Sequence, residues 1–381
     1  MNEQRHIVFA GGGSGSHLYP GFATALHLQA QDPRTRITFA VEGGAFEKTQ
    51  VRAHGFSCVE IPAEPLPKAP SRMWRFVARN WKGYREATRF LDAQRVSAVV
   101  GLGGYRSLPM ARAASAKNIP LILLEPNAVP GRATRAVASK ATILCAGFPQ
   151  VLKHLPIGCS VQLTGTPVRP EIAALRLTPN SRRSTAAKGN DRQRGLLVLG
   201  GAQGSDALNR AAPYALYHLR SHLQGWHILH QAGPQEVQPT RELYRKFGLD
   251  ATVTPFVKAM GSALRRIDAA VCRSGGSLLG ELACAGIPSV LVPDPAAEND
   301  HQRINAECQA EWGGCDVCDS GDESQRFDYE LARSISPLVS DETIRMRRAE
   351  ATSRSAQPHA AHLVAMVVKK YGLPETVRNA A

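Results

Sequence analysis

Short apolar runs alternate along the chain with segments of helical periodicity, and several of the runs end in a glycine-rich turn. Residues 6–10 form the first run, and a turn at 11–17 separates it from a helix expected at about 19–29. Further runs that predict buried strands lie at 98–102, 121–124, 196–199 and 269–272. Strands that alternate with helices indicate parallel sheets, so the pattern predicts an α/β protein.

Three of these strands are followed by turns that favour ligand binding. They read Gly11-Gly12-Gly13-Ser14-Gly15-Ser16-His17 after the first strand, Gly103-Gly104-Tyr105 after the strand at 98–102, and Glu125-Pro126-Asn127-Ala128 after the strand at 121–124. The carboxyl ends of parallel strands lie at one edge of a sheet, so we expect the turns to converge on one crevice. A strand, a glycine loop and a helix together predict a phosphate-binding turn.

The first turn leaves alternatives open. As a dinucleotide fingerprint it has Ser16 where the last glycine belongs, and the acidic residue Glu42 lies farther on than the roughly twenty residues that the fingerprint expects. This pattern disfavours an NAD-dependent enzyme, which would need Glu42 to bind a ribose. His17 stands at the start of the helix, where position alone favours a packed or capping residue over a catalyst.

The stretch 271–307 reads as a strand, a glycine turn, a helix, a second strand and an acidic loop. The helix is expected over 278–285, with Gly286 as its C-terminal stop. Its N-terminus beside glycines presents N–H groups and partial positive charge, which suit a diphosphate. Glu281 lies off the Leu278/Leu282 stripe, where it either accepts hydrogen bonds from ribose hydroxyls or is a helix-flank residue of a structural βαβ unit.

Length and charge indicate the number of domains, the location of the protein and the kind of partner it binds. A chain of 381 residues predicts two domains, and no apolar run approaches the roughly eighteen residues that would cross a bilayer. The N-terminus enters a strand without a signal-peptide pattern, so we expect a cytoplasmic protein. The formal net charge of +14 implies an anionic partner such as nucleic acid, a membrane surface or a phosphorylated substrate.

The basic segment 178–195 lacks periodicity, so it is predicted to form a surface loop.

The eight cysteines fall within strand and helix patterns, as small apolar residues do in a reducing compartment. Cys315 and Cys318, with Cys308 and His301 upstream, form the one cluster that suggests a metal. A zinc site needs a second well-spaced pair, so the spacing disfavours a metal centre.

A basic amphipathic helix is expected between residues 65 and 91. Its apolar stripe consists of Trp74, Val77, Trp81, Tyr84, Thr88 and Leu91, and its basic face of Arg75, Arg79, Lys82 and Arg89. Packing in the core is expected to account for most of this stripe. The preceding loop, with Leu66, Lys68 and Met73, has no such explanation, so we expect it and the helix start to contact an anionic membrane surface. Nothing in the sequence resembles a nucleic-acid-binding module, so nucleic acid is not expected as a partner.

Seven motifs, in this order, resemble those of one family: GGGSGSHLYPG, GLGGYRSLP, LLEPNAVPGRATR, LTGTPVRPEI, LVLGGAQGSDALN, VTPFVKAM and CRSGG…GEL…NDHQRINA. From His6 to about Tyr371 the chain is similar to GT-B glycosyltransferases that move N-acetylglucosamine (GlcNAc) from UDP-GlcNAc to undecaprenyl-pyrophosphoryl-MurNAc-pentapeptide (lipid I). Their reaction completes lipid II in bacterial peptidoglycan synthesis.

The resemblance implies two Rossmann-like, doubly wound domains that face a cleft. The first, 1–168, would bind the acceptor and the membrane, and the second, 169–345, would bind the UDP-sugar. Helices at 346–373 would pack back toward the first domain. Further implied partners are the anionic inner membrane, at whose cytoplasmic face the enzyme would lie as a peripheral protein, and proteins of cell-wall synthesis. No cofactor and no metal is implied.

The same resemblance implies the site residues. The acceptor and its pyrophosphate would contact Gly12, Gly13, Gly104 and Tyr105. UDP-GlcNAc would contact the loop 200–204 and Ser14, Gly15, Ser16, Asn127, Arg169, Ala202, Val257, Gly276, Ser277, Leu278, Leu279, Gly280, Glu281 and Gln302. In this set Val257 would lie beside the uracil, Glu281 on the ribose and Gln302 on the sugar. His17 is the expected catalytic base, with Glu125 as the second candidate.

Three departures from the family pattern concern activity. The family has Gly where Ser16 stands, Ser where Ala202 stands, and His-Glu-Gln-Asn where this chain has Leu124-Glu125-Pro126-Asn127. A lost hydroxyl at 202 and an added Cβ at 16 would weaken donor binding. They keep a second hypothesis open, in which the protein is a membrane-bound scaffold of the same fold that binds the nucleotide without turnover.

Overall fold

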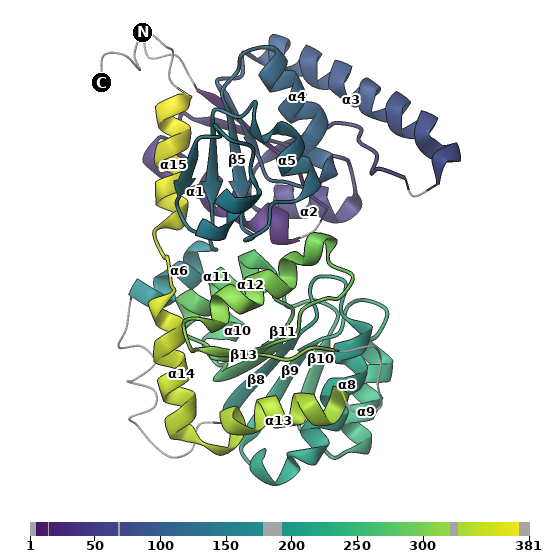
Figure 1. Ribbon diagram of the computed structural model, residues 1–381, viewed down its shortest axis with the longest axis vertical. Coiled ribbons are helices and arrows are strands. Elements are labelled where there is room, and N and C mark those ends of the chain that lie inside the picture. The colour runs from purple at the N-terminus through teal and green to yellow at the C-terminus, as the bar shows by residue number, and fades with distance from the viewer. Residues whose placement is uncertain (1–4, 14, 68, 178–192, 321–326, 373–381) are drawn as a thin grey trace. The chain divides into compact units, whose positions relative to one another are not determined.

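The computed structural model describes residues 5–13, 15–67, 69–177, 193–320 and 327–372. The chain divides into two compact units, Met1–Arg169 with His359–Ala381, and Pro170–Pro358 (Figure 1). The segment expected at 346–373 is therefore shared between the units. Helix α14 (Glu342–Arg354) lies in the second unit, and α15 (Ala360–Tyr371) lies in the first.

The described part of the first unit contains a seven-stranded parallel sheet in the order β3-β2-β1-β4-β5-β6-β7. Its strands are β1 (His6–Ala10), β2 (Arg36–Val41), β3 (Ser57–Glu60), β4 (Ala98–Gly101), β5 (Leu121–Glu125), β6 (Ile143–Ala146) and β7 (Val161–Leu163). The strand order reverses between β1 and β4, and ligands of doubly wound sheets bind outside the carboxyl ends of the strands at such a point.

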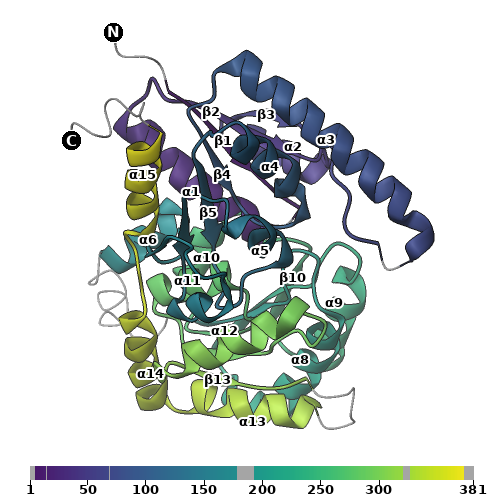
Figure 2. The same ribbon diagram turned by 45° about the horizontal axis from the view of Figure 1, so that its top comes forward.

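Helices cover both faces of this sheet (Figure 2). They are α1 (Gly15–Gln31), α2 (Ala45–Ala53), α3 (Met73–Gln94), α4 (Leu108–Ala116), α5 (Arg132–Ala138) and α15, with the 3-10 helices η1 (Pro70–Arg72), η2 (Tyr105–Ser107) and η3 (Pro149–His154). Alternation along β1 assigns the faces, because Ile7 and Phe9 belong to the core with α1 and α15, whereas Val8 and Ala10 belong to the core with α3 and α4.

The described part of the second unit contains a six-stranded parallel sheet in the order β10-β9-β8-β11-β12-β13. Its strands are β8 (Arg194–Leu199), β9 (Trp226–Gln231), β10 (Ala251–Thr254), β11 (Ala269–Cys272), β12 (Ser289–Leu291) and β13 (Cys315–Val317). Its helices are α6 (Pro170–Leu177), α8 (Asp206–His218), α9 (Val237–Lys246), α10 (Met260–Leu264), α11 (Gly276–Ala285), α12 (His301–Ala310), α13 (Phe327–Ser340) and α14, with η4 (Arg220–His222) and η5 (Glu298–Asp300). The order again reverses, between β8 and β11, so both units repeat one doubly wound plan, as predicted.

Two helix boundaries can be compared with those that the sequence pattern predicted. Helix α11 ends where it was expected, with Gly286 in the left-handed conformation at φ 60°. Helix α1 begins at Gly15, about four residues before the expected start, because glycine and serine are weak helix formers and conceal the first turn. The expected loop 178–195 lies largely outside the described residues, and β8 begins at Arg194. Within the described ranges, no helix is both long and apolar enough to cross a membrane.

Candidate functional site

The glycine turns after β1 and β4 lie against each other. Gly11 has a positive φ of 130°, and a Cβ there would lie 2.9 Å from the carbonyl oxygen of Gly103. A Cβ on Gly104 would lie 3.7 Å from Cε1 of His17 and 3.9 Å from the carbonyl oxygen of Gly12. The first unit therefore brings together the two turns and the histidine that the sequence placed at one edge of the sheet.

Helix α1 begins shortly after this turn. Ser14 lies outside the described residues, and Gly15 and Ser16 form the start of the helix. The N-terminal end of α1, with its partial positive charge, thus follows the glycine turn directly, as a phosphate-binding turn requires.

Glu125, the second candidate base, ends β5 and is 4% exposed. Its carboxylate accepts hydrogen bonds from the backbone N–H of Asn127 at 3.2 Å, the Asn127 side chain at 3.0 Å and the backbone N–H of Gly131 at 3.3 Å. Burial raises the pKa of Glu125, while hydrogen bonds from Thr134, Asn127 and Gly131 oppose the rise. These contacts commit both oxygens to shaping the turn that carries Asn127.

Arg169 ends the first unit. Its side chain is buried, at 8% exposure, and its guanidinium lies 4.2 Å from the centre of the Tyr19 ring on α1. A cation over an aromatic face is held in place without losing its charge. The structure thus gives Arg169 a fixed position close to the first turns of α1.

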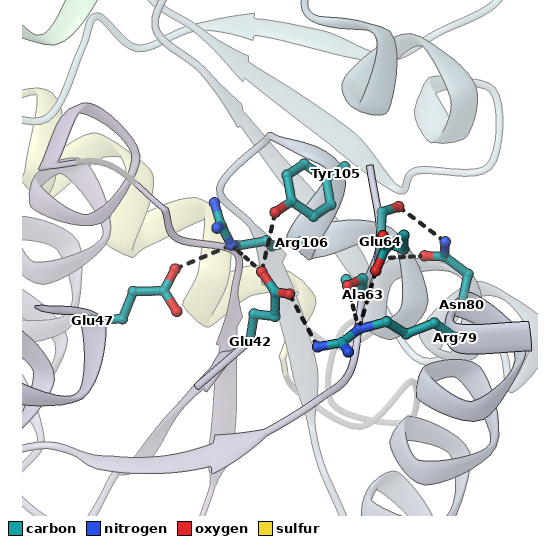
Figure 3. A network of polar contacts seen from close by, with 8 residues as sticks. All are labelled: Glu42, Glu47, Ala63, Glu64, Arg79, Asn80, Tyr105 and Arg106. Carbon is teal, nitrogen blue, oxygen red and sulfur yellow. Dashed lines mark hydrogen bonds and ion pairs between the residues drawn. The ribbon is translucent and has the colours of Figure 1, made fainter. Parts of the chain in front are cut away.

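Glu42, Glu47 and Arg106 form a charged network that the sequence did not predict (Figure 3). The Arg106 Nε atom donates to Oε2 of Glu42 at 2.6 Å and lies 3.4 Å from Oε1 of the buried Glu47. A Cβ on Gly12 would lie 2.6 Å from Oε1 of Glu47, so this carboxylate packs against the turn. Glu42 was the residue that an NAD enzyme would need for a ribose, and its carboxylate is instead bound by Tyr105, Arg106 and Arg79.

In the second unit, α11 starts at the turn after β11. Gly275 is its N-cap and provides no side chain, and Ser277 is buried in the first turn. Glu281 is 4% exposed and lies on the buried side of the helix. The buried side of the helix contains Leu279 and Leu282, whereas Leu278 is half-buried. The predicted stripe of Leu278 and Leu282 is therefore wrong at its first position, which Leu279 takes.

Gln302, near the start of α12, connects this turn to the loop after β12. Its side-chain Oε1 accepts from the backbone N–H of Asp294 at 3.1 Å, and its carbonyl oxygen accepts from the Ser274 hydroxyl at 2.7 Å. Asn305 donates to the carbonyl oxygen of Ser274 at 3.0 Å. The side-chain amide nitrogen of Gln302 donates to none of the described residues.

The loop 200–204 and Val257 are held by one residue that the sequence did not reveal. Gln231 ends β9, is 2% exposed, and donates from Nε2 to the carbonyl oxygen of Gly201 at 2.7 Å. Its Oε1 accepts from the backbone N–H of Val257 at 2.8 Å. A Cβ on Gly204 would lie 2.0 Å from the carbonyl oxygen of Ala232, so only glycine allows this loop to lie so close to the chain after β9. Gln231 thus ties the loop carrying Ala202 to the residue expected beside the uracil.

Helix α3 departs from the packing that was expected. Only Gly83, Ala87 and Leu91 are buried on it, whereas Trp74, Val77 and Trp81 are 69%, 58% and 61% exposed. The core therefore takes up only the second half of the helix, and the first half presents its apolar stripe to solvent. The expectation that core packing explains most of the stripe is wrong.

The cysteine cluster is apolar. All eight cysteines are free, and burial raises the pKa of Cys315 to about 12 and that of Cys318 to about 11. Metals bind the thiolate, which these surroundings disfavour. Among the described residues, no group of three or more His, Cys, Asp and Glu side chains is placed to hold a metal ion.

Two doubly wound units, with glycine turns at the strand ends of each, are the architecture of the GT-B fold. Residues 7–144 match the N-terminal domain of glycosyltransferase family 28, and residues 195–364 match the C-terminal domain of that family. The chain belongs to this family and, within it, to the UDP-N-acetylglucosamine–N-acetylmuramyl-(pentapeptide) pyrophosphoryl-undecaprenol N-acetylglucosamine transferases, as the following similarities show.

The transferase of this name from Acidithiobacillus ferrooxidans is 34% identical over 361 residues, which are 94% of this chain and 96% of the relative. That from Trichlorobacter lovleyi is 32% identical over 322 residues, 82% of this chain and 84% of the relative. The crystal structure of Acinetobacter baumannii MurG covers 96% of this chain and 99% of its own, with 26% identity and a TM-score of 0.72. The UDP-GlcNAc 2-epimerase from Neisseria meningitidis, 11% identical with a TM-score of 0.65, shares the fold alone.

Proposed function

We propose that the protein transfers GlcNAc from UDP-GlcNAc to the 4-hydroxyl of MurNAc in lipid I, which gives lipid II. The observation that carries this proposal is the similarity to transferases of that printed name across both units. Two local features support it: the glycine turns lie beside His17, and α11, which carries Glu281, has a glycine as its N-cap.

In the proposed reaction, the MurNAc hydroxyl oxygen forms a bond to the anomeric carbon of GlcNAc while the bond from that carbon to UDP breaks, with inversion. The hydroxyl proton passes to His17, and the negative charge leaves with UDP. Arg169 and the N-terminus of α11 would stabilise the diphosphate, because fixed positive groups favour the charge that develops as the bond breaks. Glu281 and Gln302 would hold the ribose and the GlcNAc.

Of the departures from the family pattern, Leu124 has a structural account. It is 3% exposed and packs in the apolar core with Phe9 and Ile122. An apolar residue at that position adds to the core. The hypothesis of a scaffold without turnover rests on Ser16 and Ala202 and is tested by the transfer assay below, whereas the ion pairs of Glu42 disfavour the NAD-dependent alternative.

Transfer of labelled GlcNAc to a lipid I analogue tests the function. We expect labelled lipid II with UDP-GlcNAc as the donor, and no product when the acceptor is left out. Specific binding of UDP without any transfer would support the scaffold instead.

We also propose that the protein lies on the cytoplasmic face of the inner membrane through the start of α3. This segment comprises η1 and the start of α3, the helix labelled in Figure 1. Trp74, Val77 and Trp81 provide exposed apolar area, and Arg72, Arg75 and Lys82 are exposed basic residues of the same segment. Tryptophan and basic residues together favour an anionic lipid surface. Proteins of cell-wall synthesis are further expected partners at this location.

The membrane proposal is tested by replacing Arg72, Arg75 and Lys82 with Glu. Each basic residue near an anionic surface contributes roughly 1 kcal/mol, so we expect binding to phosphatidylglycerol vesicles to be lost. Arg79 is unsuited to this test because Glu42 and Glu64 hold it, whereas Lys82 has only a long, exposed ion pair with Glu86, at 3.8 Å.

The matched control for these substitutions carries the same charge change on the second unit. Arg245, Arg265 and Arg347 are exposed there, and none of them forms an ion pair with a described residue. Replacing these three by Glu is expected to weaken vesicle binding far less. Equal losses in the two triple variants would mean that net charge, and not α3, governs the binding.

A further inference from the structure

Glu42 connects the first glycine turn to helix α3 (Figure 3). It follows β2, which ends at Val41 beside β1, so it stands at the same edge of the sheet as the turn. Its Oε2 accepts hydrogen bonds from the Tyr105 hydroxyl at 3.1 Å and from Nε of Arg106 at 2.6 Å. Its Oε1 accepts from Nη2 of Arg79, on α3, at 3.3 Å. One carboxylate therefore holds three side chains from two separate elements.

The two side chains on Oε2 lie at the turn where the acceptor is expected. A Cβ on Gly13 would lie 1.8 Å from Nη1 of Arg106, so the guanidinium rests directly on that glycine. The terminal nitrogens of Arg106 donate to none of the described residues, and its Nε is engaged by Glu42. Burial raises the pKa of Tyr105, which keeps its hydroxyl protonated as the donor to Glu42.

Arg79 anchors the other side of Glu42. Its Nε donates to the carbonyl oxygen of Ala63 at 3.0 Å and lies 3.5 Å from Oε2 of Glu64. The next residue, Asn80, donates to the carbonyl oxygen of Glu64 at 3.0 Å. The part of α3 that carries the exposed tryptophans is thus bound to the loop before it and, through Glu42, to the turn.

We propose that Glu42 is a positioning residue for acceptor binding, and that its ion pair with Arg79 makes this positioning depend on α3. The inference rests on the proposed function, since it takes the acceptor to bind at the glycine turn. Between two guanidinium groups the Glu42 carboxylate is held from both sides. Without Arg79 it is held from one side only, and Tyr105 and Arg106 gain freedom at the turn. The helix proposed to contact lipid thereby sets the geometry of the acceptor site.

The test is steady-state kinetics with a short-chain, water-soluble lipid I analogue, in the absence of membranes. Glu42→Gln keeps the size of the side chain and removes its charge, and is expected to raise the acceptor KM about tenfold. Arg79→Gln is expected to raise it roughly three- to fivefold, because the ion pair is partly exposed. Arg79→Lys, which keeps the charge, is expected to recover part of this loss. The KM for UDP-GlcNAc stays unchanged in all three variants.

Arg85→Gln is the matched control. Arg85 is exposed on the same helix and has no ion pair with any described residue, and its replacement changes the net charge equally. It should leave the acceptor KM at the wild-type value. Equal acceptor KM values for the Arg79 and Arg85 variants, with thermal unfolding unchanged in both, would overturn the inference. Absence of transfer by the wild type would overturn the proposed function, and this inference with it.

Discussion

Replacement of Gln231 by Leu probes how the donor site is held together. The Gln231 side chain is buried and makes two hydrogen bonds to backbone groups, to Gly201 at 2.7 Å and from Val257 at 2.8 Å. Leucine fills nearly the same volume and can make neither bond. The loop 200–204 and the chain at Val257 would then lose their shared anchor, although neither has been changed.

The magnitude follows from the two bonds. A buried neutral hydrogen bond contributes about 1 kcal/mol, and a backbone group left without a partner costs about 1–3 kcal/mol. The total loss is therefore about 2–4 kcal/mol. If half of it is expressed in UDP binding and half in folding, the Kd for UDP rises roughly five- to thirtyfold, since 1.4 kcal/mol corresponds to a factor of ten.

Calorimetric titration with UDP measures this effect, and denaturant unfolding measures the part expressed in folding. Gln309→Leu is the control, because Gln309 is also buried in the second unit and its amide donates to the Ser355 hydroxyl at 2.8 Å. It should lose stability and keep the wild-type affinity for UDP. A wild-type Kd for UDP in Gln231→Leu, or an equal loss of affinity in the Gln309 variant, would refute the reasoning.

Three further outcomes are expected. Glu281→Ala should raise the UDP-GlcNAc KM by one to two orders of magnitude, because charge-assisted hydrogen bonds contribute about 1.5–3 kcal/mol, and unchanged kinetics would remove Glu281 from the site. His17→Ala should lower kcat by about two to four orders of magnitude with little change in the KM for UDP-GlcNAc, whereas near-normal kcat would exclude the histidine as base. Burial lowers the pKa of His230 to about 3. Between this value and pH 6.5 the unfolded chain binds a proton that the folded protein does not, so the protein becomes less stable as the pH is lowered through this range. The free energy of unfolding should be about 2 kcal/mol lower at pH 5 than at pH 7, and His230→Phe should lack this difference. Equal pH-dependent losses in the wild type and the variant would contradict this assignment.

The sequence by itself determined the fold class and the positions of the glycine turns. Strand lengths, helical periodicity and glycines depend on residues close together in the chain, and a parallel sheet places every carboxyl end at one edge. The strand at 6–10, the turns at 11–13 and 103–104 and the helix stop at Gly286 therefore appear where the pattern predicted them. The family followed from the order of the motifs, which is also a property of the chain alone.

Tertiary structure alone decided how much of the apolar stripe of α3 is buried and which partners the polar residues have. Periodicity shows that α3 has an apolar stripe, but only the limited extent of the packed core leaves Trp74 and Trp81 exposed. Arg106 meets Glu42 across 64 positions of sequence, and Gln231 meets Val257 across 26. Such pairs depend on which strands become neighbours, and no local pattern records that choice. The roles of Glu42 and Gln231 in holding the two turns are therefore visible only in the folded protein.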